Sequence, residues 1–166
     1  GFTVGIADIV TGNGEILSST NIRKLLSNGN TRESAKMLGH WHRIDGKVIL
    51  GDQRGRELGY PTANISLEGL HMPKLGVYAV LVDILSGPHR GSSKGAASIG
   101  SKPTFGENVI NCETYIFDFH GDIYGESISV GLVDFLRPEE AFKTVDELVI
   151  QMKLDCEKAY LKLNKL

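Results

Sequence analysis

The sequence predicts a mainly β fold, in which a six-stranded antiparallel barrel is followed by a C-terminal helix and preceded by a short α/β segment. From Trp41 onward, short runs of β-branched or aromatic residues alternate with Gly, Pro, Asn and Asp, which is typical of antiparallel strands and their turns. No long helical pattern separates these runs, so a doubly wound sheet is disfavoured. Only the C-terminal end of the chain carries an extended apolar pattern with helical spacing.

The first elements are expected to be a strand over residues 2–9 and a Gly-rich turn over residues 12–14. Serines and Thr20 can then cap a helix over residues 22–26, because their hydroxyl oxygens accept hydrogen bonds from exposed backbone N–H groups. Gly29 is expected to end this helix, since glycine readily adopts the left-handed conformation found after helices.

A second helix is expected over residues 34–38, and it is followed by another glycine. Asn30 and Glu33 have the spacing of a capping box at its start. The change of texture after this helix predicts a domain boundary, which divides the chain into residues 1–38 and residues 39–166.

The second part of the chain is expected to hold the barrel strands, each bounded by turn-forming residues. The six predicted strands cover residues 43–50, 63–66, 76–84, 95–99, 111–119 and 127–135. The connection over residues 86–94 is rich in Gly and Ser, and we expect it to be mobile.

The clearest helix closes the chain. Thr144 and Glu147 have capping-box spacing at its start. Steps of three and four residues place one stripe on a single face of this helix: Leu148, Met152, Cys156, Ala159, Tyr160 and Leu163. We expect this stripe to pack on the barrel. A membrane-surface helix is the weaker alternative, because the polar face mixes acidic and basic residues.

Composition disfavours several functions. A chain of 166 residues with 41% hydrophobic content and a net charge of −2 suits one sizeable core plus an appendage, without a nucleic-acid partner. No apolar run approaches the roughly 20 residues of a membrane span, and the first residues do not resemble a signal peptide. A cytoplasmic location without a membrane partner is therefore expected. Cys112 and Cys156 lack metal-type spacing, and we expect both to be reduced.

Residues 51–64 carry the clearest chemical signal. Three glycines can bring main-chain N–H groups close to an anion, and two arginines, Arg56 among them, supply positive charge. If residues 62–64 are extended, the Thr62 hydroxyl and the Asn64 carbonyl point the same way. Two neutral oxygens suit a Mg²⁺ ion that completes its shell with waters and nucleotide phosphates. The simpler alternative is a hairpin connection with ordinary turn residues, and a P-loop motif is absent.

Five motifs, in this order, closely resemble the riboflavin kinase family. They are residues 51–64 (GDQRGRELGYPTAN), 98–105 (SIGSKPTF), 113–119 (ETYIFDF), 122–125 (DIYG) and 135–140 (FLRPEE). Upstream, residues 16–23 (ILSSTNIR) resemble the closing motif of the flavin adenylyltransferase domain that precedes the kinase in the bacterial bifunctional riboflavin kinase/FAD synthetase.

The resemblance implies a riboflavin kinase-like Greek-key barrel that uses Mg²⁺ and transfers the γ-phosphoryl group of ATP to the 5′-hydroxyl of riboflavin, giving FMN and ADP. It assigns Glu113 as the catalytic base, and Thr62 and Asn64 are the metal ligands that the pattern of residues 62–64 suggests. Glu113 begins a strongly β-prone run, where a carboxylate on an inward face would be partly desolvated. A solvated surface charge is the simpler alternative for Glu113.

The remaining site residues are also assigned by resemblance. Those assigned to ATP are Gly51, Arg56, Gly59, Thr62, Asn64, Ile116, Asp118 and Tyr124. Those assigned to the flavin are Arg137, Glu140 and Phe142, with the arginine near the phosphate of FMN and the aromatic side chain near the ring. Core packing, strand-edge exposure and turn formation are the alternatives for Ile116, Asp118 and Tyr124. A short helix with proline in its first turn is the alternative for residues 137–142.

Residues 1–38 would then be the C-terminal remnant of an FMN adenylyltransferase (nucleotidyltransferase) domain, joined covalently to the riboflavin kinase domain. The chain lacks the His-x-Gly-His segment of that domain, so we do not expect it to make FAD by itself. The rival function is a non-catalytic, regulatory module that binds flavin or nucleotide. Glu113 together with Thr62 and Asn64 argues against this rival, because a pure binder needs neither a base nor a metal pair.

Overall fold

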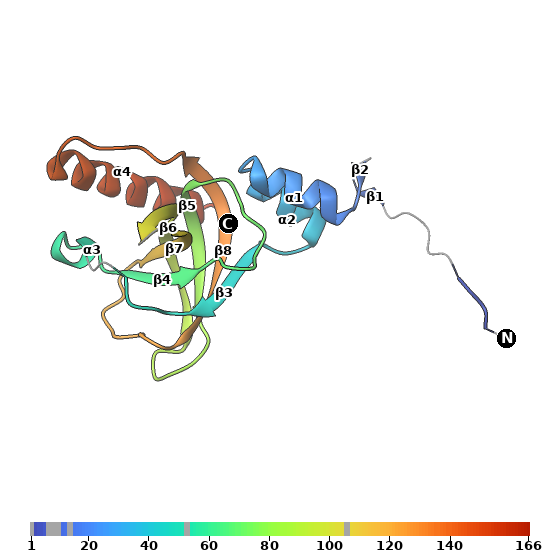
Figure 1. Cartoon of the computed structure of the whole chain (residues 1–166), viewed down its shortest axis with the longest axis horizontal. Helices are drawn as coiled ribbons and strands as arrows, with labels where there is room; N and C mark the ends of the chain where they lie inside the picture. The colour runs from blue at the N-terminus through green and yellow to red at the C-terminus, as the bar shows by residue number, and fades with distance from the viewer. Residues whose placement is uncertain (1, 6–10, 13–14, 52–53, 105–106) are drawn as a thin grey trace.

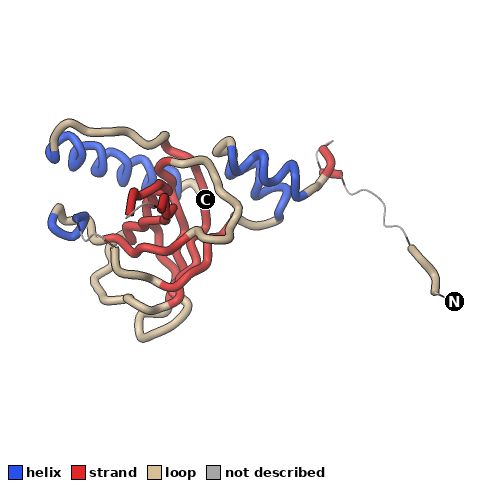
Figure 2. The backbone as a smooth tube through the Cα atoms, viewed as in Figure 1, coloured by secondary structure: helices blue, strands red, loops and turns tan. Residues whose placement is uncertain are grey.

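The computed structural model describes residues 2–5, 11–12, 15–51, 54–104 and 107–166. Figure 1 shows a β-barrel with helix α4 (Val145–Leu163) along one side and helices α1 (Ser19–Ser27) and α2 (Thr31–Leu38) next to another part of its wall. The same layers are visible by secondary structure in Figure 2, where the strands gather between the helices.

Six antiparallel strands form the sheet in the order β3-β8-β5-β6-β7-β4. Their bounds are Arg43–Lys47 for β3, Thr62–Ser66 for β4, Gly76–Ile84 for β5, Gly91–Thr104 for β6, Glu107–Ile116 for β7 and Ser127–Arg137 for β8. An isolated bridge between Ile49 and Asn64 joins the two edges, so the sheet is nearly closed. The predicted fold class, a six-stranded antiparallel barrel with a C-terminal helix, is confirmed.

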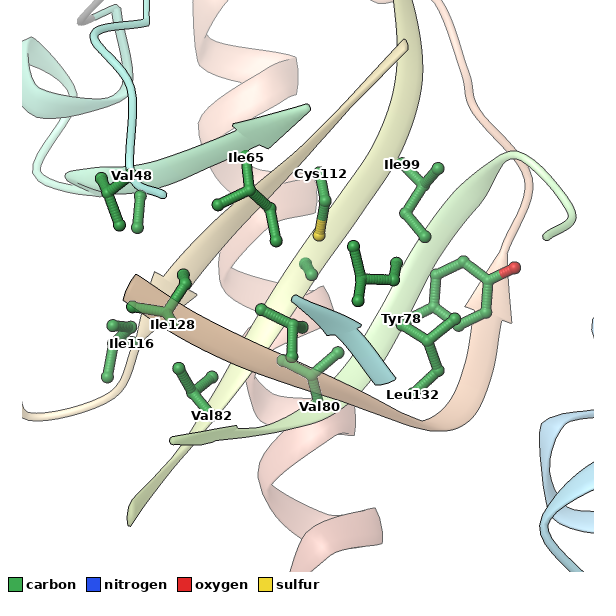
Figure 3. Packing of buried hydrophobic residues seen from close by; sticks show 14 of the residues in the cluster. Val48, Ile65, Tyr78, Val80, Val82, Ile99, Cys112, Ile116, Ile128 and Leu132 are labelled. Carbon is green, nitrogen blue, oxygen red and sulfur yellow. The ribbon is translucent and has the colours of Figure 1, made fainter. Parts of the chain in front are cut away.

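The barrel interior is filled by aliphatic side chains and one tyrosine (Figure 3). Ile65, Cys112 and Ile99 lie directly opposite one another on β4, β7 and β6, and all three are fully buried. Burying side chains of this size stabilises a fold by about 1.5–3 kcal/mol each. The Tyr78 ring lies in the same core, while its hydroxyl donates to the backbone carbonyl of Lys74.

The first part of the chain differs from the prediction. Residues 2–5 form no regular structure, so the expected strand over residues 2–9 is wrong there, and its remaining residues lie outside the described part. Two-residue strands, β1 (Thr11–Gly12) and β2 (Glu15–Ile16), pair with each other instead. The last two residues of the expected turn over residues 12–14 also lie outside the described part.

Both predicted helices are present, and they start earlier than expected. Ser18 caps α1, because its Oγ accepts a hydrogen bond from the backbone N–H of Asn21 at 3.2 Å. The predicted capping box of α2 is wrong, since Asn30 makes no side-chain cap bond and its backbone (ψ 64°) lies outside the extended region typical of capping residues. Gly39 ends α2 in the left-handed conformation, as predicted.

Helix α2 is attached to β8, and α1 is attached to the segment before β5 through a hydrogen bond from the Lys74 N–H to the Leu26 carbonyl. The Thr31 hydroxyl donates to the Val133 carbonyl at 2.7 Å, and both groups are buried. Arg32 donates to the two carboxylate oxygens of Asp134 at 2.8 and 2.6 Å. These contacts cross the predicted domain boundary after residue 38, and that boundary stays a prediction.

Two predictions about the strands need correction. The connection over residues 86–94 was expected to be mobile, but residues 91–94 belong to β6 and pair with residues 81–84 of β5. The Ser92 hydroxyl donates to the Asp83 carboxylate across this pair, so the polar residues there support strand pairing. Strand β7 ends at Ile116 rather than at residue 119, and Asp118 adopts a positive φ of 55° that extended strands do not use.

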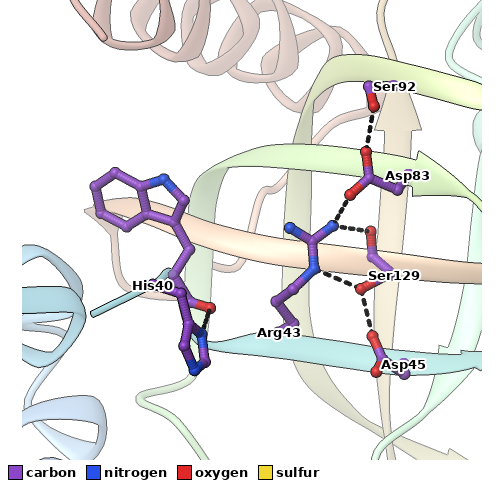
Figure 4. Close-up of polar contacts among 7 residues, drawn as sticks. His40, Arg43, Asp45, Asp83, Ser92 and Ser129 are labelled. Atoms are coloured by element: carbon purple, nitrogen blue, oxygen red, sulfur yellow. Dashed lines mark hydrogen bonds and ion pairs between the residues drawn. The ribbon is translucent and has the colours of Figure 1, made fainter. Parts of the chain in front are cut away.

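A polar network covers part of the outer wall (Figure 4). Arg43 donates to the Ser129 hydroxyl at 2.6 Å and forms an ion pair with Asp83. The Ser129 hydroxyl in turn donates to the Asp45 carboxylate. The network links β3, β8 and β5, and its partly exposed ion pair is expected to contribute at most about 1 kcal/mol.

Helix α4 begins as predicted, because the Thr144 hydroxyl accepts from the Glu147 backbone N–H at 3.2 Å. The Glu147 carboxylate reaches the N–H of Lys143 at 2.9 Å, one residue before the cap. The predicted stripe packs on the barrel, although Tyr160 is half-exposed. None of the helices that the structure describes combines the length and apolar character needed to cross a membrane.

Candidate functional site

The site is built on a row of directly paired residues that crosses five strands. In order from β8 to β4 the row contains Arg137, Val77, Ser98, Glu113 and Asn64. Directly opposite residues in a sheet project from the same face. All five side chains therefore start from one face of the barrel wall.

This face is the outer one. The neighbours of Glu113 on β7, Cys112 and Thr114, are fully buried, and Cys112 belongs to the interior core. Side chains alternate along a strand, so Glu113 must project outward. The expectation of an inward-facing carboxylate is wrong for this reason. Glu113 is nevertheless half-buried, because α4 and the segment after α3 (Arg54–Glu57) cover this part of the wall.

Two cavities meet at this row. The first has a volume of about 270 Å³ and is lined by β4, the end of β7 and residues 119–124. The second has a volume of about 300 Å³ and lies between the outer wall and the N-terminal half of α4. Thr62 lines both cavities, Asn64 lines the first, and Glu113 lines the second. The sequence motifs that were far apart are thus brought to one place.

Asn64 and Thr62 lie where the first cavity begins. The Asn64 Nδ2 lies 3.4 Å from the Thr62 Oγ1, so the two side chains are close enough to contact one ion. The Asn64 Oδ1 is buried and has no hydrogen-bond partner among the residues that the structure describes. A buried carbonyl oxygen without a partner is unfavourable unless something satisfies it. A Mg²⁺ ion fits this donor set, because it prefers oxygen ligands and retains waters or phosphates for the rest of its shell.

Gly51 fits closely against the amide of Asn64. A Cβ at this position would lie 2.5 Å from Nδ2 and 2.8 Å from Oδ1 of Asn64. Only glycine therefore allows the backbone to approach this amide without displacing it. Gly55 has a similar constraint, since a Cβ there would lie 2.4 Å from the carbonyl oxygen of Tyr60. These contacts explain two of the three glycines in the motif.

The structure brings most of the residues assigned to ATP to the first cavity. Gly51, Arg56, Thr62, Asn64, Ile116 and Tyr124 all line it. Gly59 and Asp118 do not belong to its lining. Gly59 takes a positive φ of 85° after α3, and Asp118 is exposed beside a separate surface groove.

Sequence reasoning missed several residues of the first cavity. Phe119, His120 and Asp122 line it together with Tyr124. The Asp122 carboxylate accepts from the backbone N–H of Tyr124 at 3.0 Å, which fixes the turn that carries Tyr124. The spacing of an Asp two residues before Tyr124 is the signal that could have identified this turn.

The second cavity is more apolar and combines the barrel wall with α4. Leu148, Met152 and Cys156 project from α4, and Tyr115 from β7 faces Tyr60 edge-on at 5.2 Å between ring centroids. Burial raises the pKa of Cys156 to about 11, and burial also raises the pKa values of both tyrosines. These groups therefore stay protonated at neutral pH. The cavity suits a largely apolar ligand that also carries a few polar groups.

Arg137 lines the second cavity at the end of the row opposite to Asn64. It is the last residue of β8, so the alternative of a short helix over residues 137–142 is wrong. The Arg137 guanidinium lies 5.7 Å from the centroid of the Phe142 ring, and its Nη1 lies 3.8 Å from the Glu140 carboxylate. Glu140 and Phe142 contact Arg137 without lining the cavity themselves.

The fold and the two adjoining cavities define a class of protein: a small antiparallel barrel with a polar cavity beside a more apolar one. The family model for riboflavin kinase matches residues 38–163. The chain belongs to the riboflavin kinase family.

Curated relatives agree with this family. The chain is 42% identical over 156 residues to the bifunctional riboflavin kinase/FMN adenylyltransferase of Listeria monocytogenes, which covers 93% of this chain and 48% of the relative. It is 36% identical over 155 residues to the protein of the same name from Escherichia coli K12, covering 93% of this chain and 49% of the relative. The chain thus spans about half the length of the curated relatives it matches.

Solved structures show the same fold. A Streptococcus pneumoniae chain described as a macrolide-efflux protein is 40% identical, with a TM-score of 0.79 over 89% of this chain and 47% of that chain. Riboflavin kinase from Trypanosoma brucei is 27% identical, with a TM-score of 0.54 over 74% of this chain and 80% of that chain. The second similarity extends over most of a protein described as a riboflavin kinase.

Proposed function

We propose that this chain is a riboflavin kinase that transfers the γ-phosphoryl group of ATP to the 5′-hydroxyl of riboflavin, giving FMN and ADP. The observation that supports this most strongly is the direct pairing of Asn64 with Glu113 at the junction of two cavities. Cβ atoms of such a pair are typically about 4.5–5.5 Å apart. A metal-bound phosphate held by Asn64 would therefore lie beside a carboxylate that can accept the proton of an alcohol.

ATP would occupy the first cavity. Its base would lie toward Ile116 and Tyr124, and its phosphates would lie toward Gly51, Arg56 and Thr62. Gly59 and Asp118 would act from outside the cavity, by shaping the turns beside it. Thr62 and Asn64 would hold Mg²⁺, which supplies charge stabilisation to the phosphates when it is bound. A short segment of the chain would thus position the transferred group.

Riboflavin would occupy the second cavity, with its ring between the barrel wall and α4 and its ribityl chain directed toward Glu113. Arg137, with Glu140 and Phe142 around it, would contact the flavin at the other end of the cavity. Such an arrangement separates an apolar ring site from a polar site of phosphoryl transfer, and both cavities are close to the size expected of ligand pockets.

Glu113 would accept the proton of the 5′-hydroxyl as its oxygen forms a bond to the γ-phosphorus. The bond between that phosphorus and the bridging oxygen of ADP breaks in the same step, and the proton passes from Glu113 to solvent after the products leave. Glu113 thus orients the hydroxyl and removes its proton, while Thr62 and Asn64 keep the phosphate in line.

In the curated relatives, the name also includes an FMN adenylyltransferase. We propose that residues 1–38 are the end of such a domain in this protein and that residues 39–166 are the kinase domain. We further propose a cytoplasmic location, without nucleic-acid or membrane partners. The first point is supported by the similarity of the chain to these relatives over 93% of its length, and the second by the near-neutral net charge of −2.

The direct test is to incubate the chain with riboflavin, ATP and Mg²⁺, and to separate flavins and nucleotides by chromatography. We expect FMN and ADP in equal amounts, and we expect the activity to be lost with excess EDTA and restored by added Mg²⁺. If riboflavin and ATP bind but no FMN forms, the chain is a binding module and the proposal is refuted.

A further inference from the structure

A buried acidic side chain on α4 lies beside the second cavity. Among the described residues, Asp155 is the only Asp, Glu, Lys, Arg or His side chain that is buried, and it lines the cavity together with Arg137. Arg137 Nε lies 3.1 and 2.9 Å from the two Asp155 oxygens, and Arg137 Nη2 lies 2.8 Å from Oδ2. Gln151 Nε2 donates to Oδ1 at 2.9 Å, so the carboxylate is fixed by two side chains.

The ion pair joins β8 to α4, but attachment of the helix does not by itself require charged side chains at this position. The helix is already held by the buried side chains of Ala159 and Leu163, which pack against the outer wall. Removing two charges from water is costly, and well-packed apolar residues often stabilise a fold as well as a buried pair does. The specific geometry of the pair is therefore what needs explanation.

The pair fixes the direction of the Arg137 guanidinium. Of its N–H donors, Nε and Nη2 bind Asp155, and Nη1 donates to the Pro138 carbonyl at 2.9 Å. A guanidinium has five N–H groups, so one on Nη1 and one on Nη2 make no hydrogen bond within the described part of the chain and can bind a ligand, with the Glu140 carboxylate 3.8 Å from Nη1. Asp155 balances the charge of Arg137, and the Glu140 and Glu113 carboxylates lie nearby, so this cavity is less suited to an anion than to neutral acceptors such as carbonyl oxygens.

The position of Arg137 supports the same conclusion. It lies three strands away from Glu113 in the sheet, because the order of strands is β8-β5-β6-β7. Neighbouring strands are about 4.8 Å apart, so the two Cα atoms are separated by roughly 14 Å along the wall. A flavin whose 5′-hydroxyl lies near Glu113 would place its ring, not its phosphate, toward Arg137.

We propose that Asp155 is a positioning residue for riboflavin: it holds Arg137 so that the free N–H groups bind the carbonyl oxygens of the flavin ring. This inference rests on the proposed function, because it assigns the second cavity to riboflavin. It differs from the family-based expectation for Arg137, which places the arginine near the phosphate of FMN.

The test compares Asp155→Asn with Asp134→Asn in the full chain. Asp134 is a matched control, because it also forms a bidentate pair with an arginine, Arg32, but lies outside both cavities. Binding of riboflavin and of FMN is measured by quenching of flavin fluorescence, and KM and kcat are measured for riboflavin and ATP. Thermal unfolding is recorded for every variant.

Asp155→Asn is expected to weaken riboflavin and FMN binding by the same factor, about ten- to hundredfold, which is typical of a lost hydrogen bond to a charged group. The KM for riboflavin should rise similarly, while the KM for ATP and kcat stay near wild type. Asp134→Asn should leave flavin binding unchanged. A greater loss for FMN than for riboflavin would place Arg137 at the phosphate and overturn the assignment to the ring.

A second variant separates positioning from stability. Asp155→Leu combined with Arg137→Met replaces the ion pair by apolar side chains, and we expect it to unfold at or above the wild-type temperature. It should still bind riboflavin at least tenfold more weakly. Wild-type flavin binding by this folded double variant would overturn the proposal. Because the binding assay needs no turnover, it gives an answer even if the chain proves inactive as a kinase.

Discussion

Replacing Gly51 by alanine tests the proposed metal site through a contact that the sequence alone does not reveal. The added Cβ would lie 2.5, 2.7 and 2.8 Å from Nδ2, Cγ and Oδ1 of Asn64. Ordinary contacts between nonbonded carbon atoms are about 3.5–4.0 Å, so the amide must move by about 1 Å. Asn64 is only 3% exposed, and the surrounding strands leave little room for that movement.

A displacement of about 1 Å at a positioning group can reduce the rate of an enzyme by about a hundredfold. We therefore expect Gly51→Ala to need much more Mg²⁺ and ATP for half-maximal activity and to lower kcat/KM for ATP by about this factor. Riboflavin binding should be nearly unchanged, since Gly51 does not line the second cavity. The assay is a titration of FMN formation against Mg²⁺ at fixed substrates.

Gly91→Ala is the matched control. Apart from Gly91 and its chain neighbours, no heavy atom of the described residues lies within 4 Å of a Cβ added at Gly91, which is also in an extended conformation in β6. This variant should therefore keep the wild-type dependence on Mg²⁺. If Gly51→Ala shows the same Mg²⁺ and ATP dependence as the control, Asn64 does not hold the metal ion and the proposed site is incorrect.

Two further predictions concern stability. Thr144→Ala removes the cap of α4 and should lower the free energy of unfolding by about 1 kcal/mol. Thr144→Ser keeps the hydroxyl and should retain most of the wild-type free energy of unfolding. Urea unfolding measures the stability of both variants, and equal stability would contradict the capping role. Burial, followed by the nearby His71 and His40, lowers the pKa of His42 from 6.5, so the unfolded chain binds this proton more readily than the folded chain. The free energy of unfolding of the wild type should therefore fall as the pH drops below 6.5. His42 contributes at most about 1.4 kcal/mol per pH unit to this fall. His42→Gln should therefore show a smaller dependence of the free energy of unfolding on pH. An unchanged slope in His42→Gln would contradict the assignment.

Local patterns predicted most of the fold. Strand β5 has the predicted bounds, and the ends of the other strands moved by a few residues. The caps at Thr144 and Gly39 were recognisable because each uses a residue with a specific backbone or side-chain role. The extension of β6 to Gly91 was not recognisable, because polar residues on an exposed strand look like a loop in the sequence.

The sequence indicated candidate site residues, whose roles stay predictions, but it did not indicate how these residues are arranged in space. The motif after Gly51 indicated the Thr62 and Asn64 pair, which alternation in a strand places on one face. The outward direction of Glu113 could not be inferred, because it depends on which side of β7 faces the core. The role of Asp155 could not be inferred either, because this residue lies inside an apolar helical stripe and its partner Arg137 is distant in the sequence.

The most direct test of the account is the effect of Glu113→Gln on turnover and on ligand binding measured side by side. Glutamine keeps the size of the side chain but cannot accept the proton of the 5′-hydroxyl in the same way. General-base catalysis typically contributes a factor of 10² to 10⁴, so kcat should fall by at least about a hundredfold while the affinities for riboflavin and for Mg-ATP stay within about threefold of wild type. A variant that binds both ligands and retains wild-type kcat would contradict the account.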